Sequence, residues 1–251
     1  MSEEHARTLP LVEKEFAEDS FSHTGKEASF TAWWLQNTAK QDALVQIEDV
    51  AIMVRRDVFS PDPATTNSVS LLFRVFPDVR DKRVLDIGTG SGVLAIKAAF
   101  EGAKEIVATD IDKAALENAG DNIVRTNTQG TIKIIDTDRF EEVGGQFDVI
   151  IMNIILASRQ KDVASSPLLA TQSLSLHHRL IAALPELLAP DGVVVLGFGS
   201  IGDIDGLRKL LADSKLNVTV VTERAFDVNW YAIKLRPRPP RQGHAAPPLQ
   251  L

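Results

Sequence analysis

The sequence contains no cysteine among its 251 residues. This absence excludes disulfide bonds, thiolate metal sites and a cysteine nucleophile. The first thirty residues lack the basic start and apolar core of a secretory signal, and the longest apolar stretches, such as 192–199, are far shorter than a membrane span. We therefore expect a cytoplasmic protein that does not enter a membrane.

Several patterns of hydrolases and metal proteins are also missing. No HxxxH or HExxH spacing occurs, the carboxylates form no metal-binding loop, and no GxSxG pattern marks a serine nucleophile. We therefore expect neither a metal site nor a serine hydrolase. The net charge of −7 argues against a nucleic-acid partner and favours a small molecule or a protein as substrate.

Composition and periodicity indicate one enlarged globular domain. Hydrophobic residues make up 44% of the chain and charged residues 24%, which is ordinary for a folded protein of this length. We expect strands near 83–87, 105–109, 131–135, 147–152, 192–198, 217–222 and 228–235. Because helical periods separate most of these runs, the pattern predicts an α/β fold. Its Rossmann-like, seven-stranded sheet would be mostly parallel, with helices on both faces.

One βαβ unit, residues 82–112, carries most of the functional information. An apolar run at 84–87 is followed by glycines at 88, 90 and 92, and residues 93–100 then continue at helical period. Asp110 ends the next apolar run, roughly twenty residues beyond the glycine turn. A carboxylate at the end of such a strand can accept both hydrogen bonds of a ribose diol. The unit therefore predicts a pocket for a nucleoside.

The glycine spacing favours one class of nucleoside. The spacing is GxGxG, whereas a dinucleotide site needs GxGxxG for its pyrophosphate. The stretch resembles the glycine motif of class I S-adenosylmethionine-dependent methyltransferases, and the segments IKIIDTDRF at 132–140 and FDVIIMN at 147–153 match that family in order. The resemblance spans residues 58–235. This part of the chain is similar to the core of the ribosomal protein L11 methyltransferases. It implies S-adenosyl-L-methionine as cofactor.

The same resemblance assigns roles around the cofactor. An acidic residue after the third strand accepts the adenine amine; Asp136 and Asp138 both fit, and we prefer Asp138. Asp86 is buried by pattern, so it must accept hydrogen bonds from the glycine turn or from the ammonium of the cofactor. Asp110 has an alternative role as a helix N-cap, for which Asp112 is better placed. The predicted cofactor site comprises Asp86, Gly88, Thr89, Gly90, Gly92, Asp110, Ile111, Asp138, Arg139 and Asn153.

Asn153 ends the fourth strand of the core, where this family faces the transferable methyl group. The residues that follow are Ile-Ile-Leu, whereas many amino-group methyltransferases have Pro-Pro-Tyr. This departure disfavours nucleic-acid bases and glutamine amides as acceptors, and it looks closer to the Asn-Ile-Leu pattern of the enzymes that methylate ribosomal protein L11. Alternatively, the apolar residues 154–156 form the floor of a pocket for a hydrophobic small molecule, or pack against a helix.

His177 and His178 precede a helix expected at 179–188. A methyl acceptor often loses a proton, and we take His178, together with Asn153, as a catalytic candidate. The alternative is that both histidines are exposed residues of a polar loop.

Residues 1–57 are expected to form an N-terminal extension with a helix near 26–40 and one or two strands within 43–59. Trp33 and Trp34 are candidates for a lid, with core packing or a dimer contact as the alternative. Phe59 and Thr65 are expected beside the substrate, and Thr65 or Thr66 is expected to cap a helix that runs to Phe76. The proline-rich tail at 236–251 is expected to be disordered.

Methyl transfer to a nitrogen or oxygen atom of a small molecule or protein is the function we expect. Two alternatives remain: an enzyme that cyclises the cofactor's own aminobutyrate chain to azetidine-2-carboxylate, and a non-catalytic cofactor-binding subunit. The sequence does not determine the oligomeric state, and a homodimer is one possibility.

Overall fold

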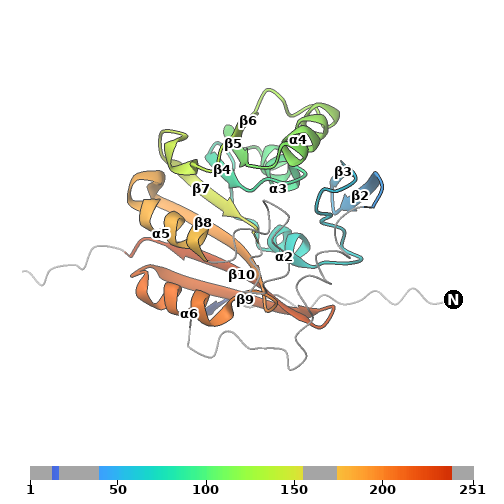
Figure 1. Cartoon of the computed structure of the whole chain (residues 1–251). Helices are drawn as coiled ribbons and strands as arrows, with labels where there is room; N and C mark the ends of the chain where they lie inside the picture. The colour runs from blue at the N-terminus through green and yellow to red at the C-terminus, as the bar shows by residue number, and fades with distance from the viewer. Residues whose placement is uncertain (1–12, 17–39, 155–173, 239–251) are drawn as a thin grey trace, which may run out of the picture.

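The computed structural model describes residues 13–16, 40–154 and 174–238, and one large sheet organises them (Figure 1). The strand order is β1-β9-β10-β8-β7-β4-β5-β6. The strands are β1 (Lys14–Glu15), β4 (Arg83–Ile87), β5 (Glu105–Asp110), β6 (Ile132–Asp136), β7 (Phe147–Met152), β8 (Leu188–Gly199), β9 (Asn217–Ala225) and β10 (Val228–Arg236).

The seven expected strands are confirmed, but the expected total of seven is wrong because β1 adds an eighth. This strand has two residues and pairs antiparallel with the outer edge of β9. A two-residue strand has no alternation of apolar and polar positions, so only its tertiary partner reveals it.

The middle of the sheet is parallel. β4 pairs in parallel with β5 and β7, β5 pairs with β6, and β7 pairs with β8, whereas β10 is antiparallel to both of its neighbours. The carboxyl ends of parallel strands meet at one edge of a sheet, where such folds bind ligands. The glycine turn after β4, Asp110 at the end of β5 and Asn153 after β7 are thereby brought to the same edge.

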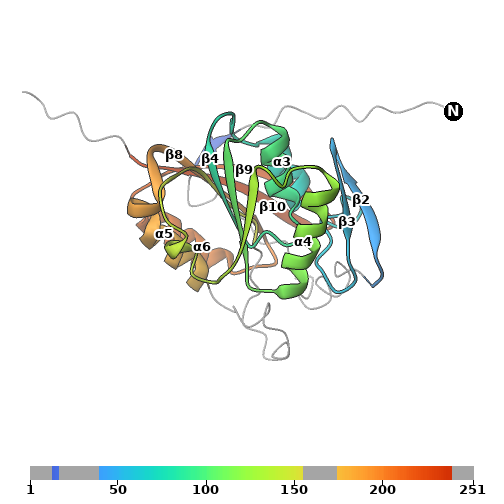
Figure 2. The same ribbon diagram turned by 90° about the horizontal axis from the view of Figure 1, so that it is seen from above.

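Helices cover both faces of the sheet, as predicted (Figure 2). Strands buried on both faces have nearly continuous apolar sequences, which is why β4 and β7 showed no alternation. Figure 2 shows α3 and α4 on one face and α5 and α6 on the other. The helices are α2 (Ser68–Arg74), α3 (Val93–Phe100), α4 (Lys113–Arg125), η2 (Phe140–Glu142), α5 (Ser175–Leu187) and α6 (Ile204–Asp213).

A hairpin of β2 (Ala43–Ile47) and β3 (Val50–Val54) packs outside α3 and α4. Its inward side chains, including Ile47 and Ile52, belong to the same hydrophobic cluster as α3. An isolated two-stranded hairpin is marginally stable in water. The expected strands within 43–59 are therefore a hairpin that shares the core of the sheet.

Two predictions about helix starts are wrong. Helix α2 begins at Ser68 and ends at Arg74, two residues before Phe76, and its N-cap is Asn67, which makes no side-chain capping bond. The Thr65 hydroxyl instead donates to the carbonyl oxygen of Asp62 at 3.2 Å, while the Thr66 hydroxyl accepts from the Ser68 amide at 3.5 Å.

Helix α5 begins at Ser175, so His177 and His178 lie in its first turn and not in a preceding loop. The buried side chains of Leu180, Leu184 and Leu187 continue the stripe that starts at His177. Because histidine is not an apolar residue, the sequence pattern predicted that the helix begins after His178.

The expected helix near 26–40, with Trp33 and Trp34, and the tail from residue 239 onward lie outside the described residues. In the ranges that the structure describes, no helix combines the length and the apolar character needed to cross a membrane.

Candidate active site

The glycine turn after β4 is anchored to the neighbouring strand. The backbone amides of Gly88 and Thr89 donate to the carbonyl oxygen of Thr109 at 2.8 and 2.9 Å. Gly88 has a φ of +70°, and a Cβ atom there would lie 2.5 Å from Cδ1 of Ile154. A side chain at this position would therefore be strained and would also collide with the segment after β7.

Gly92 has a different role from the other glycines of the turn. Its φ is +84°, and a Cβ atom there would lie 3.2 Å from the Cβ of Ala119 on α4. We expected Gly92 beside the cofactor, whereas the structure places it where α3 packs against α4.

Asp110 organises the loop around it. Its Oδ2 accepts a hydrogen bond from the Gly90 amide at 2.9 Å, and its Oδ1 accepts from the amides of Ile111 and Asp112 at 2.8 and 3.0 Å. Burial raises the pKa of this carboxyl group, and the amide bonds oppose that rise. A carboxylate has about four acceptor positions, so about one remains for a ligand hydroxyl. Asp112 caps α4 by accepting from Ala114 at 3.0 Å, as expected.

Asp86 lies fully buried beneath the glycine turn. The Thr89 hydroxyl donates to its Oδ2 at 2.7 Å, while its Oδ1 has no hydrogen-bond partner. Burial raises the pKa of Asp86 to about 7, the bond from Thr89 opposes the rise, the charge of Asp110 adds to it, and the Ala95 backbone also opposes it. A buried acceptor without a partner is costly, so this oxygen suits a ligand that brings a cation or an N–H group.

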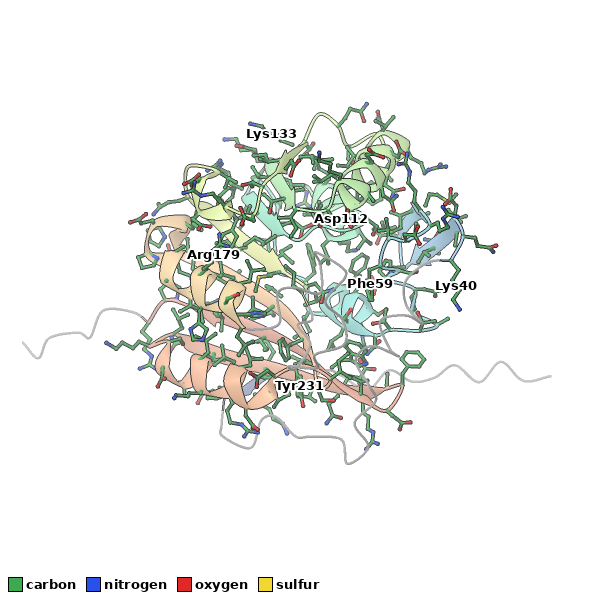
Figure 3. All side chains as sticks on the ribbon, viewed as in Figure 1. Lys40, Phe59, Asp112, Lys133, Arg179 and Tyr231 are labelled. Atoms are coloured by element: carbon green, nitrogen blue, oxygen red, sulfur yellow. The ribbon has the colours of Figure 1, made fainter. Side chains whose placement is uncertain are left out.

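A cavity of about 250 Å³ opens at this edge of the sheet. Seven of the ten predicted cofactor residues line it: Gly88, Thr89, Gly90, Asp110, Ile111, Asp138 and Asn153. Of the other three, Asp86 reaches the turn through Thr89, Gly92 packs against α4, and Arg139 forms an ion pair with Glu142. Figure 3 shows Phe59 and Asp112 on one side of this region and Arg179 on the other; all three line the cavity.

Asn153 and its neighbours form a more apolar end of the cavity. Asn153 Nδ2 donates to the Ser68 hydroxyl at 3.3 Å, and its Oδ1 is buried without a partner. A Cβ atom at Gly197 of β8 would lie only 2.0 Å from that Oδ1, so the glycine makes room for the side chain. Phe59 lines the cavity beside Val58 and Pro61, whereas Thr65 does not.

Neither histidine of α5 lines the cavity. His177 is fully buried with its ring edge against Phe198 at a centroid distance of 5.6 Å, and neither ring nitrogen has a partner. Burial lowers the pKa of His177 to about 3, so the ring is neutral near pH 7. His178 is exposed on the helix surface. The general base expected at His178 therefore gains no support from the geometry.

Comparison with known proteins identifies the family. The profile of the family described as Ribosomal protein L11 methyltransferase (PrmA) matches residues 60–163. A protein of Methanocaldococcus jannaschii, provisionally named a protein N5-glutamine methyltransferase, is 31% identical over 174 residues, which cover 66% of this chain and 85% of that protein. The chain belongs to the class I S-adenosylmethionine-dependent methyltransferases.

Other relatives match shorter parts of this methyltransferase. The ribosomal protein L11 methyltransferase of Syntrophotalea carbinolica is 36% identical over 115 residues, which cover 46% of this chain and 31% of that enzyme. The chain spans less than half the length of the L11 methyltransferases that match it in sequence. The crystal structure of the L11 methylase from Lactobacillus delbrueckii subsp. bulgaricus shares the fold, with a TM-score of 0.55 at 24% identity. That match covers 77% of this chain and 98% of the other.

The cofactor of this methyltransferase is S-adenosylmethionine. A solved methyltransferase in complex with S-adenosylhomocysteine has the same fold, with a TM-score of 0.57 at 14% identity, over 78% of this chain and 56% of that one. The site's own chemistry fits the group: a nearly saturated carboxylate at Asp110 with one acceptor position left, and an unpartnered buried oxygen on Asp86 below the turn.

Sequence reasoning missed part of the cavity wall. The lining residues that it did not single out include Val69, Leu94, Ala115, Thr137, Leu176 and Arg179. Most are apolar positions indistinguishable from core in the sequence. Arg179 lies 41 residues beyond Asp138, and no local pattern links the two.

Proposed function

We propose that this methyltransferase transfers the methyl group of S-adenosylmethionine to a nitrogen atom of a protein or small-molecule acceptor that enters beside Asn153. The observation that carries the proposal is that one cavity joins the glycine turn and Asp110 to Asn153 and Phe59. When bound, the cofactor supplies an electrophilic methyl group on a sulfonium. The protein then needs mainly to hold the acceptor in line with it and to exclude water.

The residues that line each part of the cavity suggest which part of the cofactor they bind. Asp110 is proposed to hold the ribose with its remaining acceptor position, and Asp138 and Ile111 to flank the adenine. The unpartnered Oδ1 of Asp86 and the hydroxyl of Thr89 lie below the turn at the end proposed for the amino-acid part. These assignments divide the cavity into a polar cofactor end and an apolar acceptor end.

Nitrogen is favoured over oxygen as the acceptor because the described acceptor end offers no base. The titratable residues in the described lining are Asp110, Asp112, Asp138 and Arg179, all on the cofactor side. A neutral amine carries a lone pair without help, whereas a hydroxyl must lose its proton. Asn153 can orient such a nitrogen through its amide. The M. jannaschii and L11 relatives, named for protein substrates, support a protein acceptor.

Calorimetry and mass spectrometry test the proposal. S-adenosylhomocysteine should bind and NAD should not. Incubation with methyl-labelled cofactor and candidate amines should yield S-adenosylhomocysteine and a labelled amine. Cyclisation of the cofactor would instead release methylthioadenosine and azetidine-2-carboxylate without any acceptor, and that product pattern would overturn the methyl-transfer proposal. Binding without turnover of either kind would favour a non-catalytic subunit.

Changing Asp110 to Ala should weaken S-adenosylhomocysteine binding. A hydrogen bond to a charged acceptor contributes on the order of 1.5–3 kcal/mol, so removing one ribose contact predicts roughly a tenfold to hundredfold loss. Isothermal titration of both proteins measures the change. An unchanged dissociation constant would refute the ribose assignment.

A further inference from the structure

Arg179 on α5 holds the segment 137–142, which comprises the loop after β6 and the short helix η2, at three points. Its Nη2 donates to the carbonyl oxygen of Asp138 at 2.6 Å and to both carboxylate oxygens of Glu141 at 2.8 Å. The guanidinium carbon lies 5.1 Å from the centre of the Phe140 ring. One side chain from a distant helix thus contacts the backbone, an aromatic face and a carboxylate of the same short segment.

The segment 137–142 forms a wall of the cofactor cavity. Asp138 and Phe140 line the cavity, and so does Arg179 itself. Asp138 lies between the end of β6 at Asp136 and the start of η2 at Phe140, so no strand ladder or helix fixes its backbone. Its position therefore depends on contacts such as the one from Arg179.

The guanidinium is already engaged in these contacts. A guanidinium that faces a cofactor or substrate cavity often binds a carboxylate of the ligand. In this structure, however, Arg179 already binds the Glu141 carboxylate and stacks over Phe140. Its geometry therefore favours support of the wall over direct contact with a ligand anion.

We propose that Arg179 is a positioning residue that sets the adenine subsite by fixing the Asp138 carbonyl and the Phe140 ring. The proposal rests on the adenine assignment made under Proposed function. Leu176, one turn earlier on α5, also lines the cavity. The helix that supports the adenine wall therefore also supplies part of the cavity surface, and Arg179 fixes the two walls relative to each other.

Titration calorimetry with two probes tests the proposal. Arg179→Met should weaken the binding of S-adenosylhomocysteine and of adenosine by a similar factor, about tenfold, because both contain the adenine. Arg179→Lys should recover part of the affinity: it keeps a charge near Glu141 but lacks the planar fork that reaches the carbonyl and stacks on the ring. The matched control is Arg208→Met on α6, on the same face of the sheet, where Arg208 pairs with Asp205 at 3.0 Å; it should leave both affinities unchanged.

Glu141→Gln provides a second variant that keeps Arg179 in place. It should weaken adenosine binding less than Arg179→Met does, and the double variant should lose less than the product of the two single losses. Thermal unfolding of each variant confirms that the fold is retained.

Three outcomes would overturn the proposal. A loss for S-adenosylhomocysteine without a loss for adenosine would mean that Arg179 contacts the amino-acid part directly. Unchanged affinity for both probes in Arg179→Met would show that the wall needs no support. Wild-type protein that binds neither probe would remove the cofactor assignment itself, and this result is distinguishable because it appears before any variant is made.

Discussion

At the scale of single residues, Asp86 should make stability depend on pH near neutrality. Its folded-state pKa is raised to about 7, whereas an exposed aspartate titrates near 3.9. The folded protein therefore binds the proton more tightly, and the stabilisation, complete below about pH 3.9, is lost as the pH rises through about 7. Asp86→Asn removes this titration and keeps an acceptor for Thr89. Melting temperatures from pH 5 to 9 should fall more steeply for wild type than for the variant; parallel curves would contradict the raised pKa.

His177 should also make folding stability depend on pH, but in the opposite direction and at acidic pH. Its folded-state pKa is lowered to about 3. Between about pH 3 and 6.5, His177 is therefore protonated in the unfolded chain but neutral in the folded protein. Stability should decline as the pH falls below about 6.5, the ordinary value for histidine. His177→Phe keeps an aromatic ring against Phe198 and should unfold at higher temperature than wild type at pH 5, by a margin that shrinks toward pH 7. Equal melting temperatures for the two proteins at every pH between 5 and 7 would contradict the lowered pKa of His177.

At the scale of elements, asparagine side chains of α4 bind the backbone amides and carbonyl oxygens on the edge of β3 that does not pair with β2. Asn122 accepts from the Met53 amide at 2.8 Å and donates to the carbonyl oxygens of Met53 and Ser91 at 2.8 and 2.9 Å. Asn118 makes a similar pair of bonds to Met53 and Arg55. The two amides thus continue the strand ladder and attach the hairpin to the domain.

Replacing Asn122 by Leu should therefore be costly. It removes the partner of the Met53 amide and of the Ser91 carbonyl oxygen, while the Met53 carbonyl oxygen keeps its bond from Asn118. Each buried group left without a partner costs about 1–3 kcal/mol. We expect the free energy of unfolding to fall by about 2–4 kcal/mol in urea titrations. Glu117→Gln on the same helix breaks only an exposed ion pair with Arg55 and should cost less than about 1 kcal/mol. Equal losses for the two variants would mean that the amide bonds do not hold the hairpin.

The sequence predicted the elements whose signals are local. The apolar runs and the glycine turn placed β4, α3 and β5 correctly, and Asp112 was recognised as the cap of α4. Long-range features were not predictable: the pairing of β1 with β9, and the contact of Arg179 with Asp138, depend on residues far apart in the chain. The adjacent arginine, Arg139, was chosen for its position in the motif, but its side chain pairs with Glu142.

At the scale of the whole molecule, the hairpin decides where the chain can be shortened. Removing residues 1–40 deletes β1 at the sheet edge but keeps the hairpin and the strands from β4 to β10. We expect this variant to unfold cooperatively and to bind S-adenosylhomocysteine. Removing residues 1–57 also deletes Val45, Ile47, Val50 and Ile52 from the core, so this variant should fail to fold.

Thermal unfolding and calorimetry distinguish the two truncations. A stable, binding-competent protein that starts at residue 58 would show that the hairpin is dispensable. Because the shorter truncation removes Trp33 and Trp34, loss of turnover with retained cofactor binding would support the expected lid.

The place of β10 has a consequence for biosynthesis. Among the strands that the structure describes it comes last in sequence, yet it lies between β8 and β9 and bonds to both. Until residues 228–236 have left the ribosome, both neighbours have an open edge, and open edges pair readily with other chains. The sheet is therefore closed only once β10 has emerged. A nascent chain that stops before Val228 would lack the fully buried Trp230 and Tyr231 and would be exposed to aggregation or degradation.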